Sequence, residues 1–302
     1  METRKNNSFH NTAAKYRYLL LFTLPALLFY VVFAVYPLFA TFFISVFQTE
    51  GGERSFIGLD NYVYLFTDPT QSGQFWHALL NNLEFFAIHL IVQIPVALLM
   101  AALITSDAVR RLTGFYRTIL FIPATLSVVI VGFIWRMIIS PLWGIVGFPL
   151  LGTEATALPT LSFMSIWEWI GIPMIFLYTA LIAIPKDILE AARVDGASGM
   201  RTFWGIKFPL ITPQFGLITI LTFIWTMNGF DIIYSLMGGA PGPNYSTDIL
   251  GTFFFRSFFG YNNIIGDADF GAAVATVIFL FILICTAGYF VVLQRRLRPH
   301  EL

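Results

Sequence analysis

The sequence predicts an all-α membrane protein that crosses the bilayer six times. Of its 302 residues, 57% are hydrophobic and only 11% are charged, and Phe alone occurs 33 times. A soluble domain carries about 25% charged residues, so this composition indicates a membrane protein. A helix needs about 20 apolar residues to cross a bilayer. Segments of this kind are expected at 18–46, 79–105, 118–139, 161–184, 214–237 and 271–293. The runs are unbroken and do not alternate as barrel strands do, which favours helices.

The first apolar segment follows a basic N-terminus that contains Arg4, Lys5, Lys15 and Arg17. A secretory signal peptide begins in the same way, but its apolar core is about 7–15 residues long and ends at a small-residue cleavage site. Here the run continues from about Tyr18 to Phe47 without such a site. We therefore expect a retained first span.

Basic residues predict the orientation of the chain. Of the 17 Lys and Arg residues, all but Arg54, Arg136 and Arg256 lie in the flanks 1–17, 106–117, 185–213 and 294–302. Lys and Arg concentrate in cytoplasmic loops. This distribution predicts a cytoplasmic N-terminus (1–17), a transmembrane domain (18–295) with a cytoplasmic loop at 185–213, and a cytoplasmic tail (296–302).

The cytoplasmic loop between the fourth and fifth spans carries helix start and stop signals. Asp187 and, three residues later, Glu190 resemble a capping box that begins a short helix. Gly196 can adopt a positive φ and end it. Ser198 can cap a second short helix, which we expect Pro209 to close. The pattern predicts a bent helix pair too short to cross the membrane. A helix resting on the lipid surface is the alternative interpretation.

The residue order in this loop resembles the EAA motif of binding-protein-dependent ABC importer permeases. The matching positions are Glu190-Ala191-Ala192, Asp195-Gly196-Ala197, Phe203, Ile206, Pro209 and Pro213. Other stretches are similar to the maltose-type carbohydrate uptake branch: Phe56 to Tyr62, Phe115 to Thr118, Ile134 to Arg136, Gly238 to Pro241 with Thr247, and Phe270 to Ala275. In the usual Gly-Gly-Pro segment the three residues are contiguous, whereas Ala240 interrupts it here. The resemblance covers about residues 18–295. Within this branch the chain is similar to the larger of the two maltose permeases, but it is shorter than that protein.

This resemblance implies an ABC type I importer permease fold in the bacterial cytoplasmic (inner) membrane. It implies a sugar or oligosaccharide as solute, and an ATPase contact made by Glu190, Ala191, Ala192, Asp195, Gly196 and Ala197. The implied partners are a second homologous permease, two ATPase subunits and an extracytoplasmic solute-binding protein. The chain has no Gly-x-x-x-x-Gly-Lys-[Ser/Thr] motif, so we expect ATP and Mg²⁺ to be bound by the ATPase and this chain to be a non-enzymatic transport subunit without a cofactor. The single cysteine and four scattered histidines show no metal spacing.

A stripe of polar and aromatic residues on the fifth span is the candidate solute site. At about 100° per residue, Thr222, Trp225, Thr226 and Gly229 share one helix face. An aromatic ring beside hydroxyl groups suits a sugar, which stacks its C–H face and hydrogen-bonds through its hydroxyls. The resemblance implies that these four residues line a midmembrane sugar site together with Ile170, Gly171 and Met174 of the fourth span. Helix–helix packing by small residues is the alternative for the same stripe.

Three functions other than sugar import are compatible with a polytopic membrane protein. A permease for a glycerol phosphate-type solute is the main alternative, although no cluster of Lys or Arg lies inside the spans. A stand-alone secondary transporter or channel would need no ATPase partner. An intramembrane enzyme would need paired catalytic groups at membrane depth, and the sequence offers none.

Overall fold

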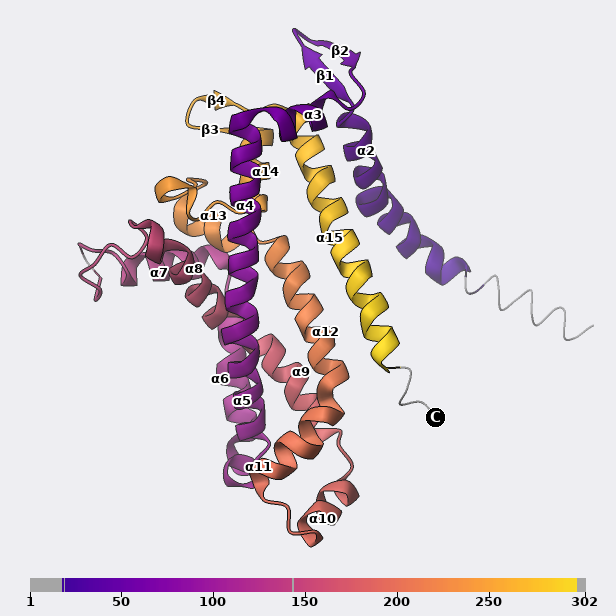
Figure 1. Ribbon diagram of the computed structural model, residues 1–302, viewed down its shortest axis with the longest axis vertical. Coiled ribbons are helices and arrows are strands. Elements are labelled where there is room, and N and C mark those ends of the chain that lie inside the picture. The colour runs from indigo at the N-terminus through magenta and orange to yellow at the C-terminus, as the bar shows by residue number, and fades with distance from the viewer. Residues whose placement is uncertain (1–17, 19, 143, 298–302) are drawn as a thin grey trace, which may run out of the picture.

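The computed structural model describes residues 18, 20–142 and 144–297, apart from the side chains of 107, 108, 110 and 293–297. The expected cytoplasmic N-terminus 1–17 and residues 298–302 of the expected tail lie outside the described residues. The helices form an elongated bundle with a short helix, α10 (Lys186–Val194), at one end and a β-hairpin at the other (Figure 1).

Helices make up most of the described chain. Leu20–Ile44 contains η1 (Val31–Val35) and α2 (Tyr36–Ile44), and the remaining helices and helical turns are α3 (Asp60–Thr67), α4 (Pro69–Ile88), η2 (His89–Gln93), α5 (Ile94–Ile104), η3 (Asp107–Leu112), α6 (Thr113–Phe121), η4 (Ile122–Thr125), α7 (Val128–Ile138), α8 (Glu154–Trp169), α9 (Gly171–Ile182), α10, α11 (Gly199–Thr202), η5 (Phe203–Lys207), α12 (Phe208–Met227), α13 (Asp231–Met237), η6 (Pro243–Tyr245), α14 (Leu250–Phe259) and α15 (Ala268–Leu297). Two antiparallel hairpins complete the fold: β1 (Phe47–Glu50) with β2 (Glu53–Phe56), and β3 (Gly260–Tyr261) with β4 (Ile264–Ile265).

Four of the described helices are long and apolar enough to cross a membrane as single spans: Leu20–Ile44, Pro69–Ile104, Gly199–Met237 and Ala268–Val292. Two more helix pairs qualify when each is taken together. α6–η4 meets α7 at 94°, and α8 meets α9 at 49°. The described chain therefore has six spans if each bent pair makes one crossing, which is the expected number.

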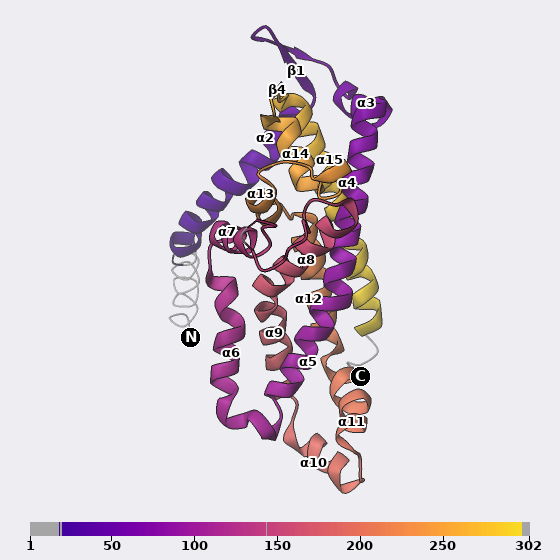
Figure 2. The ribbon, with the colours of Figure 1, turned by 90° about the vertical axis from the view of Figure 1, so that its left-hand side faces the viewer.

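The third span is not the continuous helix expected at 118–139. α6 and η4 end at Thr125, Leu126 and Ser127 are extended, and α7 turns away across the bundle (Figure 2). Pro123 lies where the α-helix α6 gives way to the 3-10 turn η4, and it supplies no backbone N–H with which α6 could continue. Hydropathy could not indicate the break, since the apolar run continues through the bend.

The second span begins well before the expected residue 79. The Asp68 side chain accepts hydrogen bonds from the backbone N–H groups of Thr70 (3.0 Å) and Gln71 (2.9 Å), and Pro69 occupies the first helical position. These are strong N-terminal signals. The first turns are polar, so a search for apolar segments recognises only the later part of the helix.

The loop between spans four and five differs in part from the expected helix pair. The capping-box prediction is wrong, because Pro185 occupies the N-cap of α10 and no side chain caps it. Gly196 has the predicted positive φ of 73°, and the Ser198 hydroxyl accepts from the Arg201 backbone N–H at 3.3 Å as predicted. Pro209 does not close the second helix. α11 continues through the wide turn η5 into α12, so the helix runs unbroken from this loop into the fifth span.

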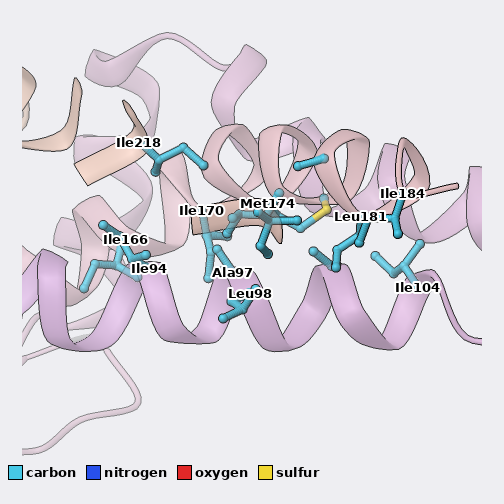
Figure 3. Close-up of a cluster of buried hydrophobic side chains, with 14 residues drawn as sticks. Ile94, Ala97, Leu98, Ile104, Ile166, Ile170, Met174, Leu181, Ile184 and Ile218 are labelled. Atoms are coloured by element: carbon cyan, nitrogen blue, oxygen red, sulfur yellow. The ribbon is translucent and has the colours of Figure 1, made fainter. Parts of the chain in front are cut away.

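The main apolar core lies where α5, α9 and α12 meet. Figure 3 shows side chains of α5, such as Ala97 and Leu98, facing those of α9, such as Met174. The first span contributes nothing to this core. None of its 18-residue apolar window is buried, although Phe42 contacts Phe279 of α15 with 5.7 Å between ring centroids.

Candidate functional site

A cavity of about 210 Å³ lies among the second, fourth and fifth spans. It forms where the wide turn η2 enters α5, where α8 bends into α9, and along one face of α12. The lining residues are Gln93, Trp169, Ile172, Pro173, Phe176, Ile218, Leu221, Thr222 and Trp225.

Two tryptophans from different spans form the aromatic part of this cavity. Trp169 ends α8 and Trp225 lies in the last turns of α12, with 5.6 Å between their ring centroids. The Thr222 hydroxyl is one helical turn from Trp225 on the same face. Ring faces beside a hydroxyl can stack on an apolar molecular face and hydrogen-bond its rim.

His89 supports Trp225 from behind. Its ring is fully buried and its centroid lies 5.6 Å from that of Trp225. A carbonyl only accepts, so Nδ1–H donates to the Phe85 carbonyl at 2.7 Å, and in the neutral ring Nε2 accepts from the Ser165 hydroxyl at 3.0 Å. Both ring nitrogens are thus used to fix the imidazole, and the fixed imidazole holds the indole of Trp225 in place.

Gln93 brings an amide to the cavity wall. The residue is 3% exposed, and no hydrogen bond from another described residue reaches its side chain. A buried amide normally has its two donors and its carbonyl acceptor paired. Gln93 can therefore offer hydrogen bonds to a molecule in the cavity.

Of the four residues predicted on the fifth span, Thr222 and Trp225 line the cavity. Thr226 is fully buried, and its hydroxyl donates to the Thr222 carbonyl at 2.9 Å. Gly229 follows the end of α12, where a Cβ would lie 2.9 Å from the Thr226 carbonyl oxygen. Thr222 and Trp225 therefore meet in the cavity, whereas Thr226 and Gly229 are not among its lining residues.

The three residues predicted on the fourth span lie in packed positions. Ile170 and Met174 belong to the apolar core against α5 (Figure 3). A Cβ at Gly171 would lie 2.6 Å from the Leu120 carbonyl oxygen, so this glycine permits close contact between α9 and α6. None of the three is among the residues that line the cavity.

The second span was not predicted to contribute to the solute site, although it supplies Gln93 to the cavity and His89 to the support of Trp225. A signal was present in the spacing. Asn82, His89 and Gln93 recur at intervals of seven and four residues, which places them on one helix face. A polar stripe inside an apolar span usually faces the protein interior.

The predicted ATPase contact lies on and just after α10, far from the cavity (Figure 1). Glu190, Ala191, Asp195 and Gly196 are exposed, whereas Ala192 is buried and Ala197 half-buried. The helix ends in a Schellman motif: Gly196 N–H donates to the Arg193 carbonyl at 3.0 Å and Ala197 N–H to the Ala192 carbonyl at 2.9 Å. The motif fixes the direction in which the chain leaves the helix.

Large apolar side chains are exposed around this helix. Val194 is 88% exposed, Met200 71% and Trp204 55%. An exposed apolar patch rimmed by charged residues is typical of a protein contact. Leu189 packs against the main core and anchors α10 to the bundle.

Similar proteins place the chain in a known class. The model of the family described as "Binding-protein-dependent transport system inner membrane component" matches residues 93–299. The arabinooligosaccharides transport system permease protein AraP of Bacillus subtilis is 31% identical, covering 87% of this chain and 84% of that protein. The lactose transport system permease protein LacF of Rhizobium radiobacter is 30% identical, covering 91% of this chain and 94% of that protein.

A solved structure has the same fold. A chain of the bacterial alginate ABC transporter, in complex with its alginate pentasaccharide-bound periplasmic protein, aligns with a TM-score of 0.78 and 21% identity over 96% of each chain. Residues 93–299, which the family model matches, contain Gln93, both halves of the bent fourth span, α10 and α12. The match therefore covers the midmembrane cavity and the loop between spans four and five. The chain belongs to the family of binding-protein-dependent transport system inner membrane components.

Proposed function

We propose that this chain forms half of the translocation pathway of an ATP-driven importer for a neutral sugar or oligosaccharide. The observation that carries the choice of solute is the cavity lined by Trp169, Trp225, Thr222 and Gln93. It combines two aromatic faces with a hydroxyl and an unpaired amide. The sugar substrates in the names of the relatives AraP and LacF support the same class of solute.

The cavity also argues against an anionic solute. No Lys, Arg or His is among its described lining residues. A phosphate group in a low-dielectric site needs paired charge or several donors. A glycerol phosphate-type solute would therefore depend on cations supplied by another chain.

The size of the cavity favours a shared pathway. At about 210 Å³ it is smaller than the roughly 300–1,000 Å³ of usual ligand pockets. We expect a second homologous permease to supply the facing wall. Ile170, Gly171, Met174, Thr226 and Gly229 then shape the backbone behind this wall and stay candidates for the pathway in other conformations.

The exposed helix α10 is proposed to dock into an ATPase subunit. Glu190, Asp195 and the small residues Ala191, Ala192, Gly196 and Ala197 would enter its cleft. ATP and Mg²⁺ would be bound by two such subunits, and this chain would need no cofactor. The unbroken helix from α11 into α12 offers a rigid lever from the docking site to Trp225. In this arrangement α10 and both termini are cytoplasmic, and the opposite end of the bundle receives an extracytoplasmic binding protein.

Copurification and ATP hydrolysis test the proposal. The tagged chain is expressed with its candidate second permease, ATPase and binding protein, and the complex is assayed in nanodiscs with a panel of neutral and acidic sugars. We expect an ATPase to copurify and its activity to rise with binding protein loaded with one neutral sugar. An assembly without an ATPase, or stimulation by glycerol phosphate alone, would contradict the proposal.

A further inference from the structure

A second and larger cavity, of about 930 Å³, lies at the hairpin end of the bundle, opposite α10. Its walls come from β1, α3, the start of α4, α14 and the β3–β4 hairpin, elements that cluster at one end in Figure 1. The volume is within the range of sites that hold a whole small ligand.

Asn61 presents an unpaired acceptor to this cavity. The residue is 7% exposed, and its amide nitrogen donates to the carbonyls of Ser45 at 2.9 Å and Phe47 at 3.0 Å. Both amide protons are used, so the group cannot turn freely. No donor from another described residue reaches Oδ1, which leaves a fixed acceptor in the wall of the cavity.

Arg256 contributes hydrogen-bond donors to the cavity, and Asp248 neutralises the charge of its guanidinium group. Its guanidinium makes a two-point ion pair with Asp248, a residue that is 1% exposed, with Nη2 to Oδ2 at 2.6 Å. Thr252 donates to the same carboxylate at 2.7 Å, and the guanidinium lies over the Tyr245 ring at 5.9 Å. Only part of its five N–H donors is used, and the remainder can bind neutral hydroxyl groups.

The charges of the lining exclude acidic ligands. Arg256 is the only cation among the described residues that line the cavity, and Asp60 and Asp267 also line it. The Asp267 carboxylate accepts from the backbone N–H groups of Asp269 (2.9 Å) and Phe270 (3.0 Å), which holds it at the start of α15. Two carboxylates beside a neutralised arginine repel an anion.

Aromatic rings and amides fill the rest of the wall. Tyr64, Tyr245 and Tyr261 supply ring faces, and Gln71 and Gln74 supply amides. Rings that stack on C–H faces, beside planar groups that both donate and accept, match a molecule covered with hydroxyls. We propose that this cavity binds a neutral oligosaccharide directly, as an entry site separate from the midmembrane cavity. The inference rests on the proposed sugar class of the solute.

Saccharide binding to the assembled transporter without its binding protein tests the entry site. The complex carries Trp225→Ala, which removes the midmembrane stacking surface, and is held in nanodiscs. Saturation-transfer difference NMR measures binding of maltotriose, raffinose and arabinotriose, with trigalacturonate as the acidic probe. Gln71→Leu and Tyr64→Leu each remove one element of the wall. Gln214→Leu is the matched control, because Gln214 is exposed on α12 far from this cavity.

We expect at least one neutral trisaccharide to bind and trigalacturonate not to compete. Gln71→Leu and Tyr64→Leu should each weaken binding about fivefold, the effect of one lost hydrogen bond or stacking contact. Wild-type binding in both variants, equal binding of trigalacturonate, or no binding of the sugar that the transporter imports would overturn the inference. So would variants that weaken only the docking of the binding protein. Sugar-stimulated ATP hydrolysis in the same preparation tests the proposed function separately, so failure of one is distinguished from failure of the other.

Discussion

Trp225 lies between two other aromatic rings from different spans. It contacts Trp169 at 5.6 Å and His89 at 5.6 Å between ring centroids, and the His89 ring is fixed by hydrogen bonds to Phe85 and Ser165. A rigid indole loses little conformational entropy when a solute stacks on it. At the scale of single residues, we therefore expect Trp225 to contribute the largest share of solute recognition.

Replacing Trp225 by Ala should lower the apparent affinity of uptake about tenfold, because the stacking face is lost. Trp167→Ala is the matched control, since Trp167 is 38% exposed and lies outside the lining of the cavity. Uptake is measured at several sugar concentrations in membranes with equal amounts of inserted permease. Wild-type uptake and ATPase coupling in Trp225→Ala would remove this residue from the pathway.

Glu168, next to Trp169, is 1% exposed, and no described residue pairs with its Oε2. An unpaired carboxylate oxygen in an apolar interior is costly, and glutamine keeps the shape without the charge. Glu168→Gln should raise the stability of the detergent-solubilised complex by about 1 kcal/mol, measured by thermal unfolding. A clear loss of stability would indicate that the assembled transporter pairs this carboxylate.

At the scale of elements, two buried asparagines join α4 to the end of α12 and to the segment that follows the fifth span. Asn82 donates to the Thr226 carbonyl at 2.8 Å and accepts from the Leu250 backbone N–H at 2.7 Å. Asn81 donates to the carbonyls of Tyr245 (2.8 Å) and Asp248 (2.7 Å). These bonds hold the end of α12 and the start of α14 against the second span.

Asn82→Ala should destabilise the complex by about 1–3 kcal/mol, because the Leu250 N–H would be left buried without its acceptor. Asn228→Ala serves for comparison, since Asn228 is exposed and its side chain donates only within its own helix, to the Ile224 carbonyl at 2.7 Å. Thermal unfolding of both variants is the measurement. Equal stability of the two variants would show that the Asn82 bonds carry little weight.

The docking role proposed for α10 is tested by changes that leave the spans intact. Glu190→Lys reverses an exposed charge, and Gly196→Leu strains a residue at φ 73° by about 1–2 kcal/mol without a steric clash. Both should lower solute transported per ATP hydrolysed, because the docking surface is altered while the membrane core is not. Normal coupling in Glu190→Lys and Gly196→Leu would refute the docking role.

Among the signals in polar sequence, Ser198 and Gly196 were predicted correctly, whereas the capping box at Asp187 was wrong and the N-cap at Asp68 was missed. Breaks inside the spans were not predicted. The bend after Thr125 falls within an apolar run, so hydropathy does not reveal it. The interruption at 228–230 contains the turn dipeptide Asn228-Gly229, a signal that the expectation of a continuous fifth span did not use. Pro209 misled in the opposite direction, because the helix continues past it directly after the wide turn η5, where the regular α-helical hydrogen-bond pattern is already interrupted.

At the scale of the whole molecule, the chain has surfaces that it does not fill itself. The first span buries none of its apolar window, the midmembrane cavity is small, and the apolar residues around α10 are exposed. Composition and the run lengths predicted the number of spans. Of the nine described residues that line the midmembrane cavity, only Thr222 and Trp225 were predicted as site residues. Gln93 and Trp169 join them through packing between segments that are distant in the sequence, and the polar stripe on the second span was the only local sign of Gln93.

The most direct test of the central claim is sugar uptake into proteoliposomes that contain the assembled complex. Radiolabelled sugar and binding protein are supplied outside, with ATP either enclosed or omitted, and with or without ion gradients. We predict accumulation of a neutral sugar that requires enclosed ATP and does not respond to the ion gradients. Accumulation driven by an ion gradient in liposomes that hold this chain without an ATPase would contradict it.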